Sequence, residues 1–185
     1  MKYILVTISV LFGYTINAQT SQSFFNTGVE KCGQQDYKAG IANFTEAIKL
    51  DPKYIEAYIN RGLSKYFLDD YQGAIIDYNK AIELGPNVKE SYNGRGLVKK
   101  ALKDYQGAMS DFTKAISIDP TYTHAYINRG SLKEKLNDFQ GAIADFTKLI
   151  EIDPADADAY SYRSDPKLSV KDTAGALKDL NKAIE

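Results

Sequence analysis

The chain has one cysteine, Cys32, and one histidine, His124, the side chains best suited to nucleophilic or acid–base chemistry. A single cysteine excludes an internal disulfide and a multi-cysteine metal site, and a single histidine excludes a His-pair metal site. The sequence also lacks a Gly-rich phosphate loop, a paired-carboxylate pocket and a serine elbow. We therefore expect no enzymatic activity, metal or cofactor, with Cys32 serving as a small packing residue and His124 solvated.

Charged side chains recur with a spacing that could also do chemistry. Four arginines are each followed, 16 residues later, by an aspartate. The pairs are Arg61 with Asp77, Arg95 with Asp111, Arg129 with Asp145, and Arg163 with Asp179. A stripe of arginines could bind an acidic ligand, but the corresponding N-terminal positions hold Thr27 and Asn43, so both charges are missing together. Because the arginine and the aspartate are present together or missing together, we favour a structural ion pair between two helices or with a neighbouring segment.

A 34-residue period organises the chain, and the stretch from Tyr58 to Pro86 is its clearest copy. Four of the five prolines mark the period: Pro52, Pro86, Pro120 and Pro154. Counting each proline as position 32, we divide the chain into repeat 1 (21–54), repeat 2 (55–88), repeat 3 (89–122), repeat 4 (123–156) and a partial repeat 5 (157–185). A fixed period of this length predicts stacked supersecondary units.

Small and aromatic residues keep the same positions in successive repeats. Position 8 is Gly28, Gly62, Gly96 and Gly130; position 20 is Ala74, Ala108, Ala142 and Ala176; position 24 is Phe44, Tyr78, Phe112 and Phe146; position 27 is Ala47, Ala81 and Ala115, with Leu149 in repeat 4. Small residues would let two antiparallel helices approach closely, with the aromatic ring filling the space between them. This Gly, Ala, aromatic, Ala, Pro pattern resembles the tetratricopeptide repeat.

The resemblance implies an all-α fold, a right-handed superhelix of about four full repeats plus a degenerate, truncated fifth. An aspartate stands at position 16 of every repeat, where it would cap the second helix. These residues are Asp36, Asp70, Asp104, Asp138 and Asp172. The prolines at position 32 should end the second helices.

Repeat 5 departs from the pattern. Ser164 replaces the glycine of position 8, and Pro166 falls inside the expected first helix, which it should break. The sequence stops at Glu185, within the second helix. We expect a frayed or degenerate repeat whose open end is either sticky or the product of truncation.

Net charge limits the class of partner, and the hydropathy of the N-terminus indicates the cellular location. The formal net charge is -1, so the chain has no basic excess to attract nucleic acid. Residues 1–18 carry Lys2 and an uncharged apolar run before Ala18, which predicts a signal peptide cleaved after Ala18. The run is too short to span a membrane. We expect an exported protein, periplasmic or secreted, with no membrane span in the mature chain.

In tetratricopeptide proteins the first helices line a concave surface that binds peptides. The resemblance places on this surface Asn26, Glu56, Ile59, Asn60, Tyr66, Glu90, Asn93, Leu97, His124, Ile127 and Asn128, with Leu63 and Phe67 at further positions of the same face. An asparagine amide can pair with any peptide group, and an apolar floor with acidic neighbours suits a segment with apolar anchors and a Lys or Arg. The lysines with which some family members clamp a terminal carboxylate are missing.

The sequence thus predicts a non-catalytic scaffold that binds a peptide or partner segment in the concave groove. A second hypothesis is a truncated remnant or adaptor piece of a longer envelope protein or enzyme. The identity of the partner is not encoded in these patterns.

Overall fold

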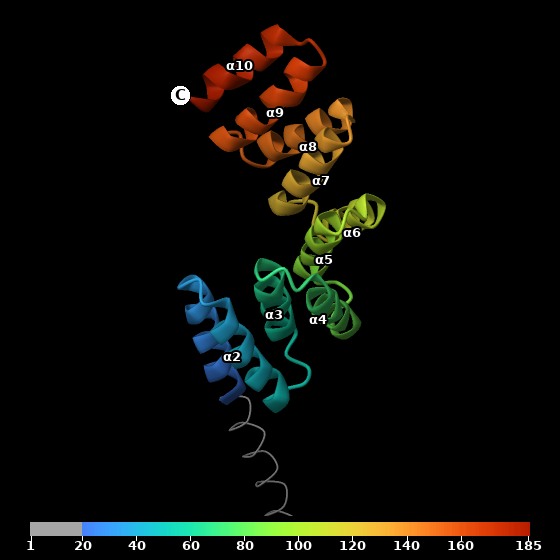
Figure 1. Ribbon diagram of the computed structural model, residues 1–185. Helices are drawn as coiled ribbons and strands as arrows, with labels where there is room; N and C mark the ends of the chain where they lie inside the picture. The colour runs from blue at the N-terminus through green and yellow to red at the C-terminus, as the bar shows by residue number, and fades with distance from the viewer. Residues whose placement is uncertain (1–19) are drawn as a thin grey trace, which may run out of the picture. The chain divides into compact units, whose positions relative to one another are not determined.

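A computed structural model describes residues 20–185 as α-helices joined by short turns, with no β-strand among them (Figure 1). The expected signal peptide, residues 1–18, lies outside the described residues. The chain forms two compact bodies, an N-terminal body that ends at Asn87 and a C-terminal body that begins at Val88. The N-terminal body contains a helix at 20–33, α2 (Tyr37–Leu50), α3 (Ile55–Phe67) and α4 (Tyr71–Leu84). The C-terminal body contains α5 (Lys89–Ala101), α6 (Tyr105–Ile118), α7 (Thr123–Lys135), α8 (Phe139–Ile152), α9 (Ala157–Ser169) and α10 (Thr173–Ala183).

The aspartate of position 16 precedes and caps each second helix, as the sequence predicted. In repeat 2, Asp70 Oδ1 accepts a hydrogen bond from the Gly73 backbone N–H at 2.9 Å, which satisfies one of the free donors at the start of α4. Equivalent bonds cap α2, α6, α8 and α10. The second helices of repeats 1 to 4 end two residues before the prolines of position 32, also as predicted.

The turn between the two helices of each repeat contains one residue with left-handed backbone. This residue stands at position 15, and its φ lies between 59° and 65°. The residues are Gln35, Asp69, Lys103, Asn137 and Lys171. The N–H of the next residue, as in Asp104 to Lys99, bonds back to a carbonyl five residues earlier and closes the end of the first helix.

The paired helices approach each other closely where position 8 is glycine. A Cβ added to Gly130 would stand 2.6 Å from Phe146 Cε1, and Gly28 and Gly96 face Phe44 and Phe112 at the same distance. The four rings of position 24 are buried. The glycines are therefore required by the neighbouring ring rather than by the local backbone.

A buried aspartate joins the two helices of repeats 2 to 5. In repeat 4, Asp145 is 3% exposed, and its carboxylate accepts hydrogen bonds from Arg129 Nε at 3.0 Å and Nη2 at 2.7 Å. Lys133 Nζ lies 2.9 Å from the same carboxylate. Asp77, Asp111 and Asp179 have the same partners in their own repeats. The predicted ion pair is confirmed, and the lysine of position 11 is an additional partner that we did not expect.

The arginine of this ion pair also connects neighbouring repeats. Arg129 Nη1 donates to Thr113 Oγ1 of the preceding repeat at 3.0 Å, and Arg61 and Arg163 bond Thr45 and Thr147 in the same way. The Arg129 guanidinium lies 5.7 Å from the centroid of the Tyr126 ring, which adds a cation–π contact. One side chain thus binds a facing helix, the preceding repeat and an aromatic ring.

Repeat 5 corrects one expectation. Pro166 does not break the first helix, because α9 runs through it to Ser169. Pro166 is fully buried at position 10, where Val98 and Leu132 are buried in repeats 3 and 4, so burial of the ring offsets the missing N–H bond. Ser164 fits because position 24 is Leu180 rather than an aromatic ring.

The buried ion pair generates a first prediction. We expect Asp145→Asn to lower the free energy of unfolding by about 3 kcal/mol, because Arg129 and Lys133 would lose a buried counter-ion. Urea denaturation followed by circular dichroism measures this. In the control Glu151→Gln, the lost carboxylate belongs to an exposed pair with Lys148, and the change should stay below about 0.5 kcal/mol. Equal losses in the two variants would contradict the structural role of the pair.

The close approach of glycine and ring generates a second prediction. Gly130→Ala should cost about 1–3 kcal/mol of stability, because its Cβ would overlap the Phe146 ring. In a Phe146→Leu background, which reproduces the pairing of Ser164 with Leu180, the same substitution should cost much less. A double-mutant cycle of thermal or urea unfolding measures the coupling. Identical costs in both backgrounds would show that the ring does not impose the glycine.

Candidate partner-binding surface

The residues expected to bind a partner all lie on the first helices of repeats 1 to 4. Asn26 is on the helix at 20–33; Glu56, Ile59, Asn60 and Tyr66 are on α3; Glu90, Asn93 and Leu97 are on α5; His124, Ile127 and Asn128 are on α7. Positions 2, 5, 9 and 12, and likewise positions 2, 6 and 9, follow one another at steps of three or four residues, so they share one face of a helix. We call this face the first-helix surface and describe it in each body separately.

In the N-terminal body, the two asparagines of this surface hydrogen-bond within their own helices. Asn26 Oδ1 accepts from Gln22 Nε2 at 2.9 Å, and Asn60 Nδ2 donates to the Glu56 carbonyl oxygen at 2.8 Å. Ile59 is half-buried against the hydrophobic core, whereas the Glu56 side chain is exposed. Ile59 therefore supports the helix pair, and Glu56 is accessible to a partner.

Tyr66 belongs to an aromatic cluster formed by Tyr37, Tyr66, Phe67 and Tyr71. Phe67 stacks on Tyr37 with ring centroids 4.8 Å apart, and Tyr66 contacts both Phe67 and Tyr71. Phe67 is 52% exposed, so the cluster presents an aromatic face to solvent. Tyr37 and Tyr71 were not expected here. The signal in the sequence was the aromatic residue at position 17: Tyr71 follows positions 12 and 13 across the turn, and Tyr37 holds the same position in the preceding repeat.

In the C-terminal body, Asn93, which we expected to contact a partner, is buried and hydrogen-bonded to its neighbours. It is 8% exposed, and its Oδ1 accepts a hydrogen bond from Asn128 Nδ2 at 2.9 Å. The Asn93 side chain also hydrogen-bonds the Tyr122 hydroxyl. This chain of side chains connects α5 to α7 and fixes the orientation of the Asn128 amide, which is itself half-buried.

Charged side chains surround Tyr122, which sequence reasoning missed. Burial raises the pKa of Tyr122 to about 12, and the nearby Glu90 carboxylate adds to this, so its hydroxyl keeps its proton at neutral pH. Lys89 Nζ lies 5.0 Å from the Tyr122 ring centroid and donates a hydrogen bond to Asp119. That bond is the main cause that lowers the pKa of Asp119 to about 2. The proline turn after α6 is thereby tied to the start of α5.

The apolar members of this surface in the C-terminal body are shared with the core. Leu97 packs against the cluster of Ala108, Phe112 and Leu132, and Ile127 packs against a second core cluster. His124 is exposed, with its ring centroid 5.4 Å from that of Tyr122. Leu97 and Ile127 can offer a partner only part of their surface, whereas the side chains of His124 and Glu90 are exposed.

Charges of both signs lie further along the first helices of the C-terminal body. Burial lowers the pKa of Lys100, and Lys135 lowers it further, which places two cations near each other. Lys135 Nζ lies 5.2 Å from the Tyr105 ring centroid. Burial also raises the pKa of Glu134, with a contribution from the Asp165 carboxylate. This part of the surface has separate basic and acidic patches.

Cys32, a candidate for nucleophilic chemistry, packs between neighbouring side chains and backbone. Cys32 Sγ lies 3.1 Å from Ser64 Oγ and fits beside Gly40, where an added Cβ would stand 2.4 Å from the sulfur. Between residues 20 and 185, the structure brings together no group of three or more His, Cys, Asp or Glu side chains suited to a metal ion. In the same range, no helix is long and apolar enough to cross a membrane.

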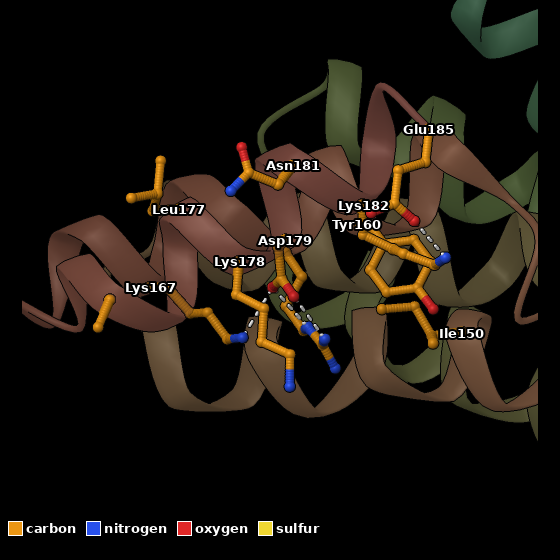
Figure 2. A pocket seen from close by; sticks show the side chains of 11 residues that line it. Ile150, Tyr160, Lys167, Leu177, Lys178, Asp179, Asn181, Lys182 and Glu185 are labelled. Carbon is orange, nitrogen blue, oxygen red and sulfur yellow. Dashed lines mark hydrogen bonds and ion pairs between the residues drawn. The ribbon is translucent and has the colours of Figure 1, made fainter.

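A cleft lies away from the first-helix surface, between α8, α9 and α10 (Figure 2). Its volume is about 750 Å³, and its walls include Ile150, Tyr160, Leu177 and Asn181. The Arg163–Asp179–Lys167 network forms one side of it, and the Lys182–Glu185 ion pair flanks it. From the sequence we expected only an open end of the repeat array in this region.

Solved structures with the same fold cover most of this chain. MamA residues 41 to the end, from Desulfovibrio magneticus RS-1, match with a TM-score of 0.75 and 18% identity, covering 89% of this chain and 93% of that one. YrrB, described as a TPR protein with an unusual peptide-binding site, matches with a TM-score of 0.66 and 22% identity over 87% of this chain and 83% of its own. The first TPR of Spaghetti (RPAP3), solved with the HSP90 peptide SRMEEVD, matches with a TM-score of 0.62 and 22% identity, covering 64% of this chain and 94% of that one.

Family models reach the same result from the sequence, although no curated protein matches it significantly. Tetratricopeptide repeat models match residues 55–88, 89–122 and 123–156, together more than half of the chain. The matched ranges coincide with repeats 2, 3 and 4, whose paired helices share the glycine–ring contact and the buried Arg–Asp pair. An all-α solenoid of this construction, with these matches, makes the chain a member of the tetratricopeptide repeat family.

Proposed function

We propose that this protein is a non-catalytic scaffold that binds a peptide or a segment of a partner protein along the first-helix surface. The tetratricopeptide fold supports a role in protein interaction, and two of the similar structures are described as binding peptides. The proposal for this chain depends on its own side chains.

The observation that carries the proposal is the fixed amide of Asn128. Asn93 Oδ1 accepts a hydrogen bond from the Asn128 side-chain amide, so this amide is oriented before any partner binds. The carbonyl oxygen and the second N–H of Asn128 form no other side-chain hydrogen bond within residues 20–185 and are suited to a peptide N–H and C=O. Because the orientation is already fixed, binding would cost little side-chain entropy.

The residues around Asn128 indicate which kind of segment would fit. Leu97 and Ile127 provide half-buried apolar surface on neighbouring helices, and Glu90 provides an exposed carboxylate. A segment with an apolar anchor and a nearby Lys or Arg matches both features. Within the N-terminal body, the aromatic cluster offers stacking surface of its own to a partner segment.

Affinity capture tests the proposal with two matched triple variants. The contact variant combines Glu56→Ala, Glu90→Ala and His124→Ala, all exposed on first helices, and the control combines Gln72→Ala, Gln106→Ala and Gln140→Ala, all exposed on second helices. We expect the wild type and the control to retain a partner from an envelope extract and the contact variant to lose about tenfold or more in affinity, about 1.4 kcal/mol. Equal retention by both variants would rule out the first-helix surface as the binding site.

We further propose that the protein is exported. The support is the charged Lys2 and the uncharged run that ends at Ala18, typical of a cleaved signal peptide. N-terminal sequencing of the protein recovered from its native cells should give a chain that begins at Gln19. A chain that still begins at Met1 in the cytoplasmic fraction would contradict export.

A further inference from the structure

Two lysines at the C-terminal ends of neighbouring first helices form a cationic pair within the C-terminal body. Lys100 is at position 12, in the last turn of α5, and Lys135 is at position 13, the last residue of α7. The two helices are in contact. Burial lowers the pKa of Lys100, and repulsion from the Lys135 ammonium group lowers it further. We call these two residues the lysine pair.

An aromatic ring of repeat 3 holds the Lys135 side chain in place. Lys135 Nζ lies 5.2 Å from the ring centroid of Tyr105, which is at position 17 and also interacts with the Lys100 ammonium group. The N-terminal body has the same arrangement, because Phe67 at position 13 stacks on Tyr37 at position 17 of the preceding repeat. The repeat geometry therefore keeps the Lys135 ammonium group on this ring, where a cation–π contact stabilises it.

Neither ammonium group of the lysine pair has a counter-ion within residues 20–185. Other lysines of this body do pair with carboxylates: Lys89 with Asp119, Lys99 with Asp111, Lys133 with Asp145, Lys148 with Glu151, Lys167 with Asp179 and Lys182 with Glu185. A half-buried cation that lacks a counter-ion and is repelled by a second cation does not stabilise the fold. Such perturbed groups gather where proteins bind ligands.

The nearest carboxylate in the sequence does not neutralise the pair. Glu134 precedes Lys135, but successive residues of a helix point in different directions, and no ion pair joins the two within the described residues. Burial raises the pKa of Glu134, and the carboxylate that adds to this effect is Asp165 of α9. The negative charge of Glu134 is therefore associated with α9 rather than with Lys100.

We propose that the lysine pair is an anion site that binds an acidic side chain of the partner segment. This inference rests on the function proposed above and adds a second charge that the segment must carry. A carboxylate would accept a hydrogen bond from each ammonium group and would offset the repulsion between them.

The two ends of the first-helix surface in this body then bind opposite charges. Glu90 lies in the first turn of α5, and the lysine pair lies at the ends of α5 and α7. Lys100 is ten residues after Glu90, which is about 15 Å along the helix. An extended segment covers that distance in about four or five residues. The partner segment should therefore carry a Lys or Arg and, about four or five residues away, an Asp or Glu.

Peptide display tests this proposal without a known partner. A library of random peptides is selected on the immobilised wild type, on a Lys100→Met, Lys135→Met double variant and on Glu90→Gln. We expect the wild type to enrich peptides that contain a basic and an acidic residue at this spacing. The double variant should lose the preference for the acidic residue and keep the basic one, and Glu90→Gln should do the reverse.

Synthetic copies of the enriched peptides give the size of the effect. Replacing the acidic residue of the peptide by its amide should weaken binding to the wild type about tenfold and should hardly affect binding to the double variant. The control Lys148→Met, Lys182→Met removes two exposed lysines from second helices of the same body and should bind the peptides like the wild type.

A measurement on the free protein checks the lysine pair itself. Because folding lowers the pKa of Lys100, its charge is less favourable in the folded chain than in the unfolded chain at neutral pH. Lys100→Met should therefore unfold at the same temperature as the wild type or at a higher one, and Lys135→Met should raise the pKa of Lys100 in an NMR titration. A lower unfolding temperature for Lys100→Met would give Lys100 a structural role and overturn the proposal.

The display results separate this proposal from the one on which it rests. Enrichment of basic residues without any acidic preference would overturn the anion site and leave the first-helix surface as the binding site. An acidic preference that survives in the double variant would place the anion elsewhere and also overturn the proposal. A selection that enriches no peptide would contradict the proposed scaffold function, and the anion site with it.

Discussion

A buried carboxylate with two cationic partners is the interaction on which repeats 2 to 5 depend. A charge such as that of Asp145 is tolerated away from water only when it is fully paired, and Arg129 and Lys133 of the facing helix both pair with it. Burial raises the pKa of the equivalent Asp179 carboxyl, but Arg163 and Lys167 together outweigh this effect and hold it below its usual value. The Asp179 carboxyl is thus charged at neutral pH, and its two ion pairs hold α9 and α10 in one arrangement.

This constant framework carries a surface that changes from repeat to repeat. The arginine of position 7 is invariant in repeats 2 to 5, whereas position 12 is Tyr66, Lys100, Glu134 and Leu168 in the same repeats. Aromatic side chains gather in the N-terminal body, and separate basic and acidic patches occur in the C-terminal body. A rigid frame with varied side chains suits recognition of one particular segment rather than of any peptide.

The parts of the fold that could be predicted are those that a 34-residue period repeats. The aspartate caps, the Arg–Asp pairs and the glycine–ring contacts follow from residue types at fixed positions. The continuation of α9 through Pro166 could not be predicted, because the burial of the proline ring that offsets its missing N–H depends on tertiary packing. The burial of Asn93 could not be predicted either. Its hydrogen bonds to Asn128 at position 6 and Tyr122 at position 34 join two helices, and residue types at single positions do not reveal such a bond.

Site-specific photo-crosslinking in native cells tests most directly whether the first helices carry a partner. A benzoylphenylalanine introduced at exposed His124 on α7 reports on the first-helix surface, and one at exposed Ile76 on α4 is the reference. We expect position 124 to crosslink to one defined protein and position 76 to give no such crosslink. Crosslinks at neither position, or the same products from both, would contradict a scaffold that binds through its first helices.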